Sequence, residues 1–209
     1  VPTPAAETTA FDPSRPRKHL RFINRGDIFT LDLNQMSYMQ DFRLTYAIRE
    51  GLYAPIGPKF EPMPAGATHV DVSPDKTVYT FHLRPEAKWS NGDPVTAHDY
   101  VFSWFRLLED PGEYTYLFYP IKGSEAYQAA YKNKQGDRRT VGIEAVDDLT
   151  FRVTLRQPLT YMLDLVAFPP FYPRHEPSMR EFAVYENDDE TTGRVLTYKN
   201  QLSLIHISE

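Results

Sequence analysis

The sequence contains no cysteine among its 209 residues, which excludes disulfide bonds, thiol nucleophiles and cysteine-type zinc sites. No run of apolar residues approaches the ~20 that a membrane-spanning helix requires, and no basic segment followed by an apolar one marks a signal peptide. Lysine and arginine are scattered, and the formal net charge is only -5. Because no concentrated basic surface is indicated, we do not expect nucleic acid as a partner.

Sequence patterns typical of catalysis are also missing. The chain has no GxSxG, GxGxxG or Walker pattern. Its histidines show no HExxH or other paired spacing of a metal site, since His82 falls in a predicted strand and His98 in the first turn of a predicted helix. Asp147 and Asp148 are adjacent carboxylates, but neighbours on a turn point apart, which favours a solvated hairpin tip. We therefore expect no enzymatic activity, no cofactor and no metal ion.

The most informative segment that is present runs from Val78 to Trp104. Apolar and polar residues alternate from Val78 to Leu83, the pattern of a half-buried strand. Asn91-Gly92 then predicts a tight turn. Thr96 and Asp99 have the spacing of a capping box, and the apolar residues that follow recur every three or four positions. The segment therefore predicts a strand, a turn and a capped amphipathic helix in direct succession.

Hairpins and helices are mixed along the rest of the chain, which is typical of an α+β fold. Trp89 and Trp104 are expected in the core, because they lie beside a predicted strand and on an apolar helix stripe. Four prolines between 55 and 64 are expected to break regular structure. The remaining predicted elements are a strand over 19–24, a helix over 41–53, a hairpin of 70–73 with 78–83, helices over 97–108, 124–132 and 158–168, a hairpin of 141–146 with 150–155, at most a short helix over 176–185, and an acidic loop over 186–193.

The segment 78–104 resembles the signature of the family 5 extracellular solute-binding proteins, the oligopeptide- and dipeptide-binding receptors of bacterial ABC importers. The residues that carry the resemblance are Phe81-His82-Leu83-Arg84, Ala87-Lys88-Trp89-Ser90-Asn91-Gly92, Pro94-Val95-Thr96-Ala97 and Asp99-Tyr100-Val101-Phe102-Ser103-Trp104. Thr30-Leu31-Asp32, Glu50-Gly51-Leu52 and the hairpin at 141–155 are similar to further elements of that family. The likeness extends over about residues 18 to 185, so chance agreement in one motif does not explain it.

The sequence departs from the family in three places. Leu33 stands where the family usually has proline, and residues 63–69 differ from the family's corresponding segment. The family's members are more than twice as long as this chain, which predicts a truncated reading frame. Leu202 to Glu209 resembles the translation of a sequencing-library adapter, although a short natural strand is the alternative interpretation.

The resemblance implies an incomplete two-lobed fold of the type II periplasmic binding proteins, with only its N-terminal part present. The boundaries implied are a flexible tether over 1–17, the first part of the lower lobe over 18–50, an inserted extra domain over 51–175, a return into the lower lobe over 176–201 and a non-native tail over 202–209.

The resemblance also implies a function, the capture of peptides and their delivery to an ABC permease by closure of two lobes. The segments that face the ligand in the family correspond here to Ser37, Tyr38 and Met39, and to Tyr114 and Tyr116. Thioether and aromatic groups accept varied side chains, and core packing is the alternative role for each. Because neutral Ser37 stands where oligopeptide receptors offer a carboxylate to the peptide amino terminus, amine capture would need another residue.

Two other functions stay open at this point. One is a receptor for another solute, such as a sugar or a metal chelate, and the other is a sensory or scaffold module on the same fold. The resemblance implies a periplasmic or extracellular location, with a lipid anchor as an option, and we expect a monomer that contacts permease subunits. Since a cleft with one wall cannot enclose a ligand, we expect the 209-residue chain alone to bind peptide weakly or not at all.

Overall fold

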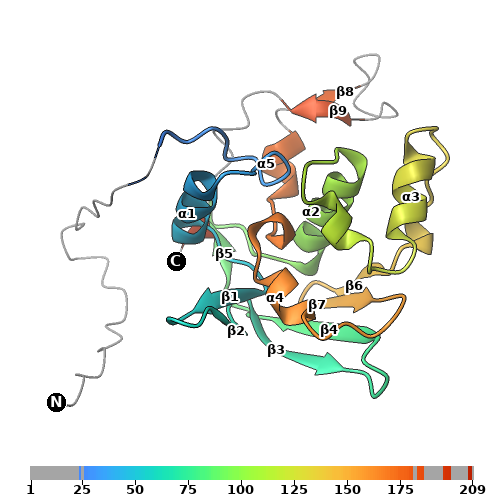
Figure 1. Ribbon diagram of the computed structural model, residues 1–209, viewed down its shortest axis with the longest axis horizontal. Helices are drawn as coiled ribbons and strands as arrows, with labels where there is room; N and C mark the ends of the chain where they lie inside the picture. The colour runs from blue at the N-terminus through green and yellow to red at the C-terminus, as the bar shows by residue number, and fades with distance from the viewer. Residues whose placement is uncertain (1–23, 25, 181–182, 186–194, 199–206, 209) are drawn as a thin grey trace.

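The fold was analysed in a computed structural model that describes residues 24, 26–180, 183–185, 195–198 and 207–208 (Figure 1). Helices and strands are mixed, as the α+β prediction requires. The helices are α1 (Met39–Ile48), α2 (Ala97–Glu109), α3 (Ser124–Tyr131), α4 (Met162–Val166) and α5 (Glu176–Arg180), and short 3-10 segments cover Thr115–Phe118, Arg138–Thr140 and Pro169–Phe171. The strands are β1 (Tyr53–Ile56), β2 (Glu61–Pro64), β3 (Ala67–Val72), β4 (Val78–Leu83), β5 (Lys88–Trp89), β6 (Ile143–Asp147), β7 (Thr150–Thr154), β8 (Ala183–Tyr185), β9 (Val195–Tyr198) and β10 (Ile207–Ser208).

A four-stranded antiparallel sheet in the order β3-β4-β7-β6 forms the base of the molecule. The predicted alternation in β4 is confirmed, because Tyr79, Phe81 and Leu83 are buried and the residues between them are only partly buried. Helix α2 contacts β6 and β7 on the buried face, and Figure 1 shows α1, α2, α3 and α5 on that same side of the sheet. One face of the sheet is thus covered by helices and the other carries the partly buried and exposed residues of β3 and β4.

Trp104 lies at the centre of the core between sheet and helices and is fully buried. Its ring packs edge-on against Phe118, Phe151 and Phe171 at centroid distances of 5.4, 4.8 and 5.2 Å. Its indole N–H donates to the Phe171 carbonyl at 2.9 Å, which satisfies the one polar atom of the side chain. Trp89 is buried as well, so both tryptophans have the core positions predicted for them.

The start of α2 has the predicted capping box between Thr96 and Asp99. The Thr96 backbone N–H donates to the Asp99 carboxylate at 2.8 Å, and the Trp89 indole N–H donates to the same oxygen at 3.2 Å. Burial raises the pKa of Asp99, and the hydrogen bonds from Thr96 and Trp89 oppose that rise. The cap therefore also fastens the β5 turn to the helix.

Helix α1 ends at Ile48, five residues before the predicted end at Tyr53. Gly51 lies against the Tyr172 ring and the Val166 carbonyl, so closely that a Cβ there would be 2.3 Å from the ring. Leu52 instead accepts hydrogen bonds from the backbone of Ala65 and Ala67. Packing against a distant part of the chain thus ends the helix early.

The prolines between 55 and 64 do not exclude regular structure, contrary to the prediction. β1 and β2 form a two-stranded hairpin in which Pro55 is paired with Pro62. A proline lacks the backbone N–H, but a two-stranded ribbon has only edge strands, where that missing donor is tolerated. The turn between the strands contains Gly57 and Phe60 at positive φ.

Two helices near the C-terminal end are shorter than predicted. Helix α4 covers only part of the expected 158–168, and the Leu159 carbonyl before it accepts a hydrogen bond from the Tyr79 hydroxyl of β4. Helix α5 ends at Arg180, and residues 183–185 form strand β8, paired with β9. In both cases a contact with residues outside the predicted helix determines the local conformation.

Several predictions fall on residues outside the described part of the chain. These are the tether over 1–17, the strand over 19–24 apart from Asn24, the acidic loop over 186–193 and most of the tail over 202–209. In the tail, β10 pairs with β5, a pairing that leaves the origin of the tail untested. Within the described residues, none of the helices combines the length and the apolar character that crossing a membrane demands.

Candidate ligand-binding site

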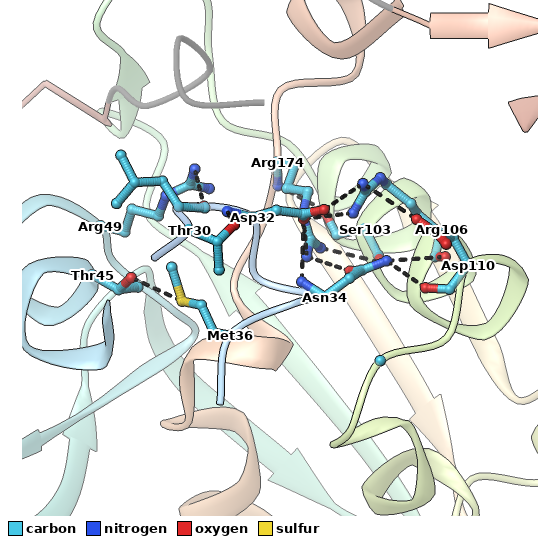
Figure 2. A network of polar contacts seen from close by, with 12 residues as sticks. Thr30, Asp32, Asn34, Met36, Thr45, Arg49, Ser103, Arg106, Asp110 and Arg174 are labelled. Atoms are coloured by element: carbon cyan, nitrogen blue, oxygen red, sulfur yellow. Dashed lines mark hydrogen bonds and ion pairs between the residues drawn. The ribbon is translucent and has the colours of Figure 1, made fainter. Parts of the chain in front are cut away.

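The loop before α1 is held by a buried ion pair between Asp32 and Arg106 of α2 (Figure 2). The guanidinium donates to both carboxylate oxygens at 2.8 Å, and both side chains are 3% exposed. Arg174 adds a second cation 3.7 Å from the same carboxylate. Two parallel hydrogen bonds fix distance and orientation together, so this contact positions the loop on α2.

The charge on Asp32 is maintained by its partners. Burial alone would raise the pKa of this carboxyl, but the charges of Arg106 and Arg174 and the hydrogen bonds from Arg106 and Asn34 outweigh burial and lower the pKa. The carboxylate therefore stays ionised at neutral pH inside the protein.

Asn34 extends the network to the end of α2. Its amide group donates to the Asp110 carbonyl at 2.8 Å and accepts from Arg174 at 2.5 Å. Gly112 approaches Asn34 so closely that a Cβ on Gly112 would lie 1.5 Å from the Asn34 carbonyl oxygen. The contacts of Asn34 thus join the loop just before the first predicted ligand-facing segment to the loop just before the second.

The three residues predicted to face the ligand in the first segment lie at the start of α1. Ser37 is half-buried, whereas Tyr38 and Met39 are 53% and 62% exposed. The Tyr38 ring stacks on Phe29 at a centroid distance of 4.7 Å, which leaves the other face of the ring accessible. Met36, from the same loop, is fully buried and accepts a hydrogen bond from Thr45.

The second predicted segment also contains both exposed and buried residues. Tyr116 is 58% exposed. Tyr114 packs against Phe42 and Phe168 at 5.6 and 5.1 Å, so part of this ring serves the core. Thr115 is buried and exchanges hydrogen bonds with the Gly112 backbone, a purely structural role.

Phe42 connects the two segments. It lies one helical turn after Tyr38 and contacts the Tyr114 ring. It belongs to a small buried cluster with Leu33, Met36 and Tyr172. The structure therefore brings both predicted segments onto one support, although the sequence alone gave no contact between them.

Asp41, the acid nearest Ser37, already has a structural partner. Its side chain is fully buried, and one carboxylate oxygen accepts a hydrogen bond from the Phe29 backbone N–H at 2.9 Å. This bond fastens the segment before the loop to α1. Asp41 is therefore poorly placed to reach a ligand amine.

A group that sequence reasoning missed lies on the opposite face of the sheet. One ligand atom from each of His69, Asp71 and His82 lies within 4.8 Å of the others. His69 and Asp71 are two residues apart on β3, and His82 is opposite His69 on β4. Only the cross-strand register brings them together, and a search for paired histidines along the sequence cannot see it.

Comparison with known proteins identifies the family. Residues 61–197 match the model of the bacterial extracellular solute-binding proteins, family 5 Middle. The chain belongs to this family. The solved Listeria monocytogenes OppA bound to peptide has 38% sequence identity and a TM-score of 0.67, over 78% of this chain and 32% of that one.

Two curated relatives show the range of sequence identity and coverage. The dipeptide-binding protein DppE of Bacillus subtilis is 43% identical over 62% of this chain and 23% of its own length. The probable deoxycholate-binding periplasmic protein YgiS of Escherichia coli is 30% identical over 83% of this chain and 32% of its own length. The chain thus spans between 23% and 32% of these relatives, which agrees with the predicted partial periplasmic-binding fold.

Proposed function

We propose that this chain is part of a peptide receptor that captures peptides outside the cytoplasmic membrane and delivers them to an ABC permease. The observation that carries the proposal is the membership of family 5 together with the exposure of Tyr38, Met39 and Tyr116 at the expected ligand-facing positions. Exposed rings and thioethers on a rigid support suit ligands whose side chains vary. The receptor does no covalent chemistry in this proposal.

The proposed ligand-facing residues are Ser37, Tyr38, Met39, Tyr114 and Tyr116. Among them Tyr114 offers the smallest free surface, because Phe42 and Phe168 cover part of its ring. Since Ser37 is neutral and the Asp41 side chain is fully buried, we assign recognition of the peptide amino terminus to residues outside these two segments.

We also propose the partners, oligomeric state and location of the receptor from its family membership. Its partners are peptide and permease subunits, it acts as a monomer, and its place is periplasmic or extracellular, with lipid anchoring as one form of attachment. The domain division at residues 50 and 175 is retained as a proposal. The Asp32–Arg106 and Asp32–Arg174 ion pairs link its first two parts across the boundary at residue 50.

The proposal can be tested with the 209-residue chain by nuclear magnetic resonance. A pool of short peptides at millimolar concentration should shift the backbone signals of residues 37–40 and 114–117, with weak affinity because the chain spans under a third of its relatives. Tyr116→Ala should weaken this binding at least threefold. Tyr161→Ala, which removes a ring that is 50% exposed elsewhere, is the matched control and should leave binding unchanged.

The relative YgiS supplies an alternative ligand class for the same experiment. Parallel titrations with deoxycholate and with a disaccharide distinguish the classes. Shifts confined to residues 37–40 and 114–117 with peptide alone support the proposal. Shifts there with deoxycholate alone, or equal losses in the Tyr116 and Tyr161 variants, contradict it.

A further inference from the structure

We infer that His69, Asp71 and His82 form a binding site for a divalent transition-metal ion on the outer face of the sheet. The site is separate from the proposed peptide-binding segments and does not depend on them. Its basis is the convergence of two imidazoles and one carboxylate whose ligand atoms lie within 4.8 Å of one another.

The strand geometry explains why these side chains meet. Residues two apart on a strand project from the same face, and residues directly opposite on antiparallel neighbours have Cβ atoms about 5 Å apart. His69 and Asp71 satisfy the first relation on β3, and His69 and His82 satisfy the second. The two imidazole rings are stacked, with centroids 4.3 Å apart and planes inclined by 11°.

The hydrogen bonds around Thr68 orient one of these imidazoles for metal binding. The Thr68 hydroxyl donates its one hydrogen to the His82 carbonyl at 3.1 Å. The same oxygen lies 2.9 Å from Nδ1 of His69, and when the hydroxyl hydrogen points to the His82 carbonyl, Nδ1 is the donor in that contact. The neutral ring then carries its free lone pair on Nε2, and holding one ring nitrogen by an N–H donor is the usual arrangement of a metal-bound histidine.

The second histidine already faces the carboxylate. His82 Nε2 lies 2.9 Å from Asp71 Oδ2, and the two side chains are 33% and 73% exposed. Three ligands at about 2.0–2.2 Å from one ion are at most about 4.4 Å apart, so the observed spread of up to 4.8 Å closes by a small side-chain rotation. The exposure of Asp71 leaves room for that rotation and leaves open positions on the ion for water.

The donor set indicates which ions fit. Imidazole nitrogen with one carboxylate suits Zn²⁺, Ni²⁺, Co²⁺ or Cu²⁺. Ca²⁺ requires six or more oxygen ligands, whereas this cluster supplies the oxygens of one carboxylate. A bound ion would link β3 to β4 and stabilise that hairpin. Binding to the folded chain raises the melting temperature in proportion to the logarithm of the metal concentration.

The test is a titration of the 209-residue chain with Zn²⁺ in competition with a chromophoric chelator. We expect one Zn²⁺ per chain at this site, a rise in melting temperature, and no comparable effect of Ca²⁺. His69→Gln, His82→Gln and Asp71→Asn should each weaken binding at least tenfold. Thr68→Val, which removes the group that holds His69, should weaken it by about tenfold.

His98→Gln is the matched control, because His98 is also exposed and also faces a carboxylate, Asp148, at 3.4 Å. It should leave Zn²⁺ binding unchanged. Circular dichroism identifies any variant that fails to fold, and Asp71→Asn should fold normally because the Asp71 side chain is 73% exposed. Zn²⁺ affinity that is the same in the original chain, Asp71→Asn and His82→Gln, or an absence of binding at millimolar Zn²⁺, overturns the inference.

Discussion

Asp32 shows how a single residue determines the position of a binding loop. Its carboxylate accepts two hydrogen bonds from Arg106 and lies near Arg174, and all three side chains are 3% exposed. Removing one member of a buried ion pair is costly because the remaining charge stays buried without compensation. The sequence marked Asp32 only as part of a family motif, and its partners are 74 and 142 residues further along the chain.

Replacing Asp32 by Asn should therefore destabilise the chain by about 3–5 kcal/mol, since two buried guanidinium groups lose their carboxylate. Urea denaturation followed by circular dichroism measures the change. Glu144→Gln is the control, because Glu144 pairs with Arg152 at 3.4 Å on the surface. Exposed pairs contribute about 0–1 kcal/mol, so equal losses in the two variants would contradict the role given to Asp32.

The pH dependence of that difference provides an independent check. The folded pKa of Asp32 is lowered, so its stabilising effect is present above the pKa of the unfolded chain and is lost as the pH falls through the folded value. The gap in stability between the original chain and Asp32→Asn should stay constant above about pH 5 and narrow below about pH 4. A gap that widens on acidification would show that another group is responsible.

At the scale of elements, local sequence patterns predicted the helices and hairpins whose interacting residues are close together in the sequence. The hairpin β3–β4, the hairpin β6–β7 and helix α2 with its cap were all predicted, because each contains its own alternation, turn or capping residues. The failures have partners that lie outside the predicted element. β8 pairs with β9 across an interval of nine residues, and Gly51 ends its helix against Tyr172, neither of which any local pattern contains.

The cap of α2 is expected to contribute more than an ordinary surface cap, because Asp99 also accepts the Trp89 indole N–H. Asp99→Ala should destabilise the chain by about 2–3 kcal/mol, which combines the usual cost of a lost cap with that of an unsatisfied buried donor. Thermal denaturation measures the loss. Asp148→Ala, at an exposed hairpin tip, should change stability by under about 0.5 kcal/mol, and a similar small change for Asp99 would exclude this role.

At the scale of the whole molecule, two contacts bring distant segments into one unit. Asn34 binds the end of α2 through the Asp110 carbonyl, and Gly112 packs against the Asn34 backbone. Phe42 then contacts Tyr114, so the two proposed ligand-facing segments share one buried support. Their relative position is a property of the tertiary fold.

Gly112→Ala should test this contact directly. The added Cβ would lie 1.5 Å from the Asn34 carbonyl oxygen, which forces the two segments apart. We expect a loss of about 1–3 kcal/mol in unfolding free energy from this overpacking. Gly26→Ala is the control, because the nearest atom to its added Cβ is at an ordinary 3.7 Å. If both glycine variants retain full stability, the two segments are not held together in this way.

The sequence by itself determined the mixed fold class, the family, the capped helix after Asn91-Gly92 and the core positions of both tryptophans, because each depends on residue types at short spacing. The tertiary structure decided which residues of the two binding segments are exposed and which are buried. It also decided that Asp32 reaches Arg106 and that His69 and Asp71 meet His82. These relations depend on strand register and on packing between distant segments, and short spacing along the chain does not encode either one.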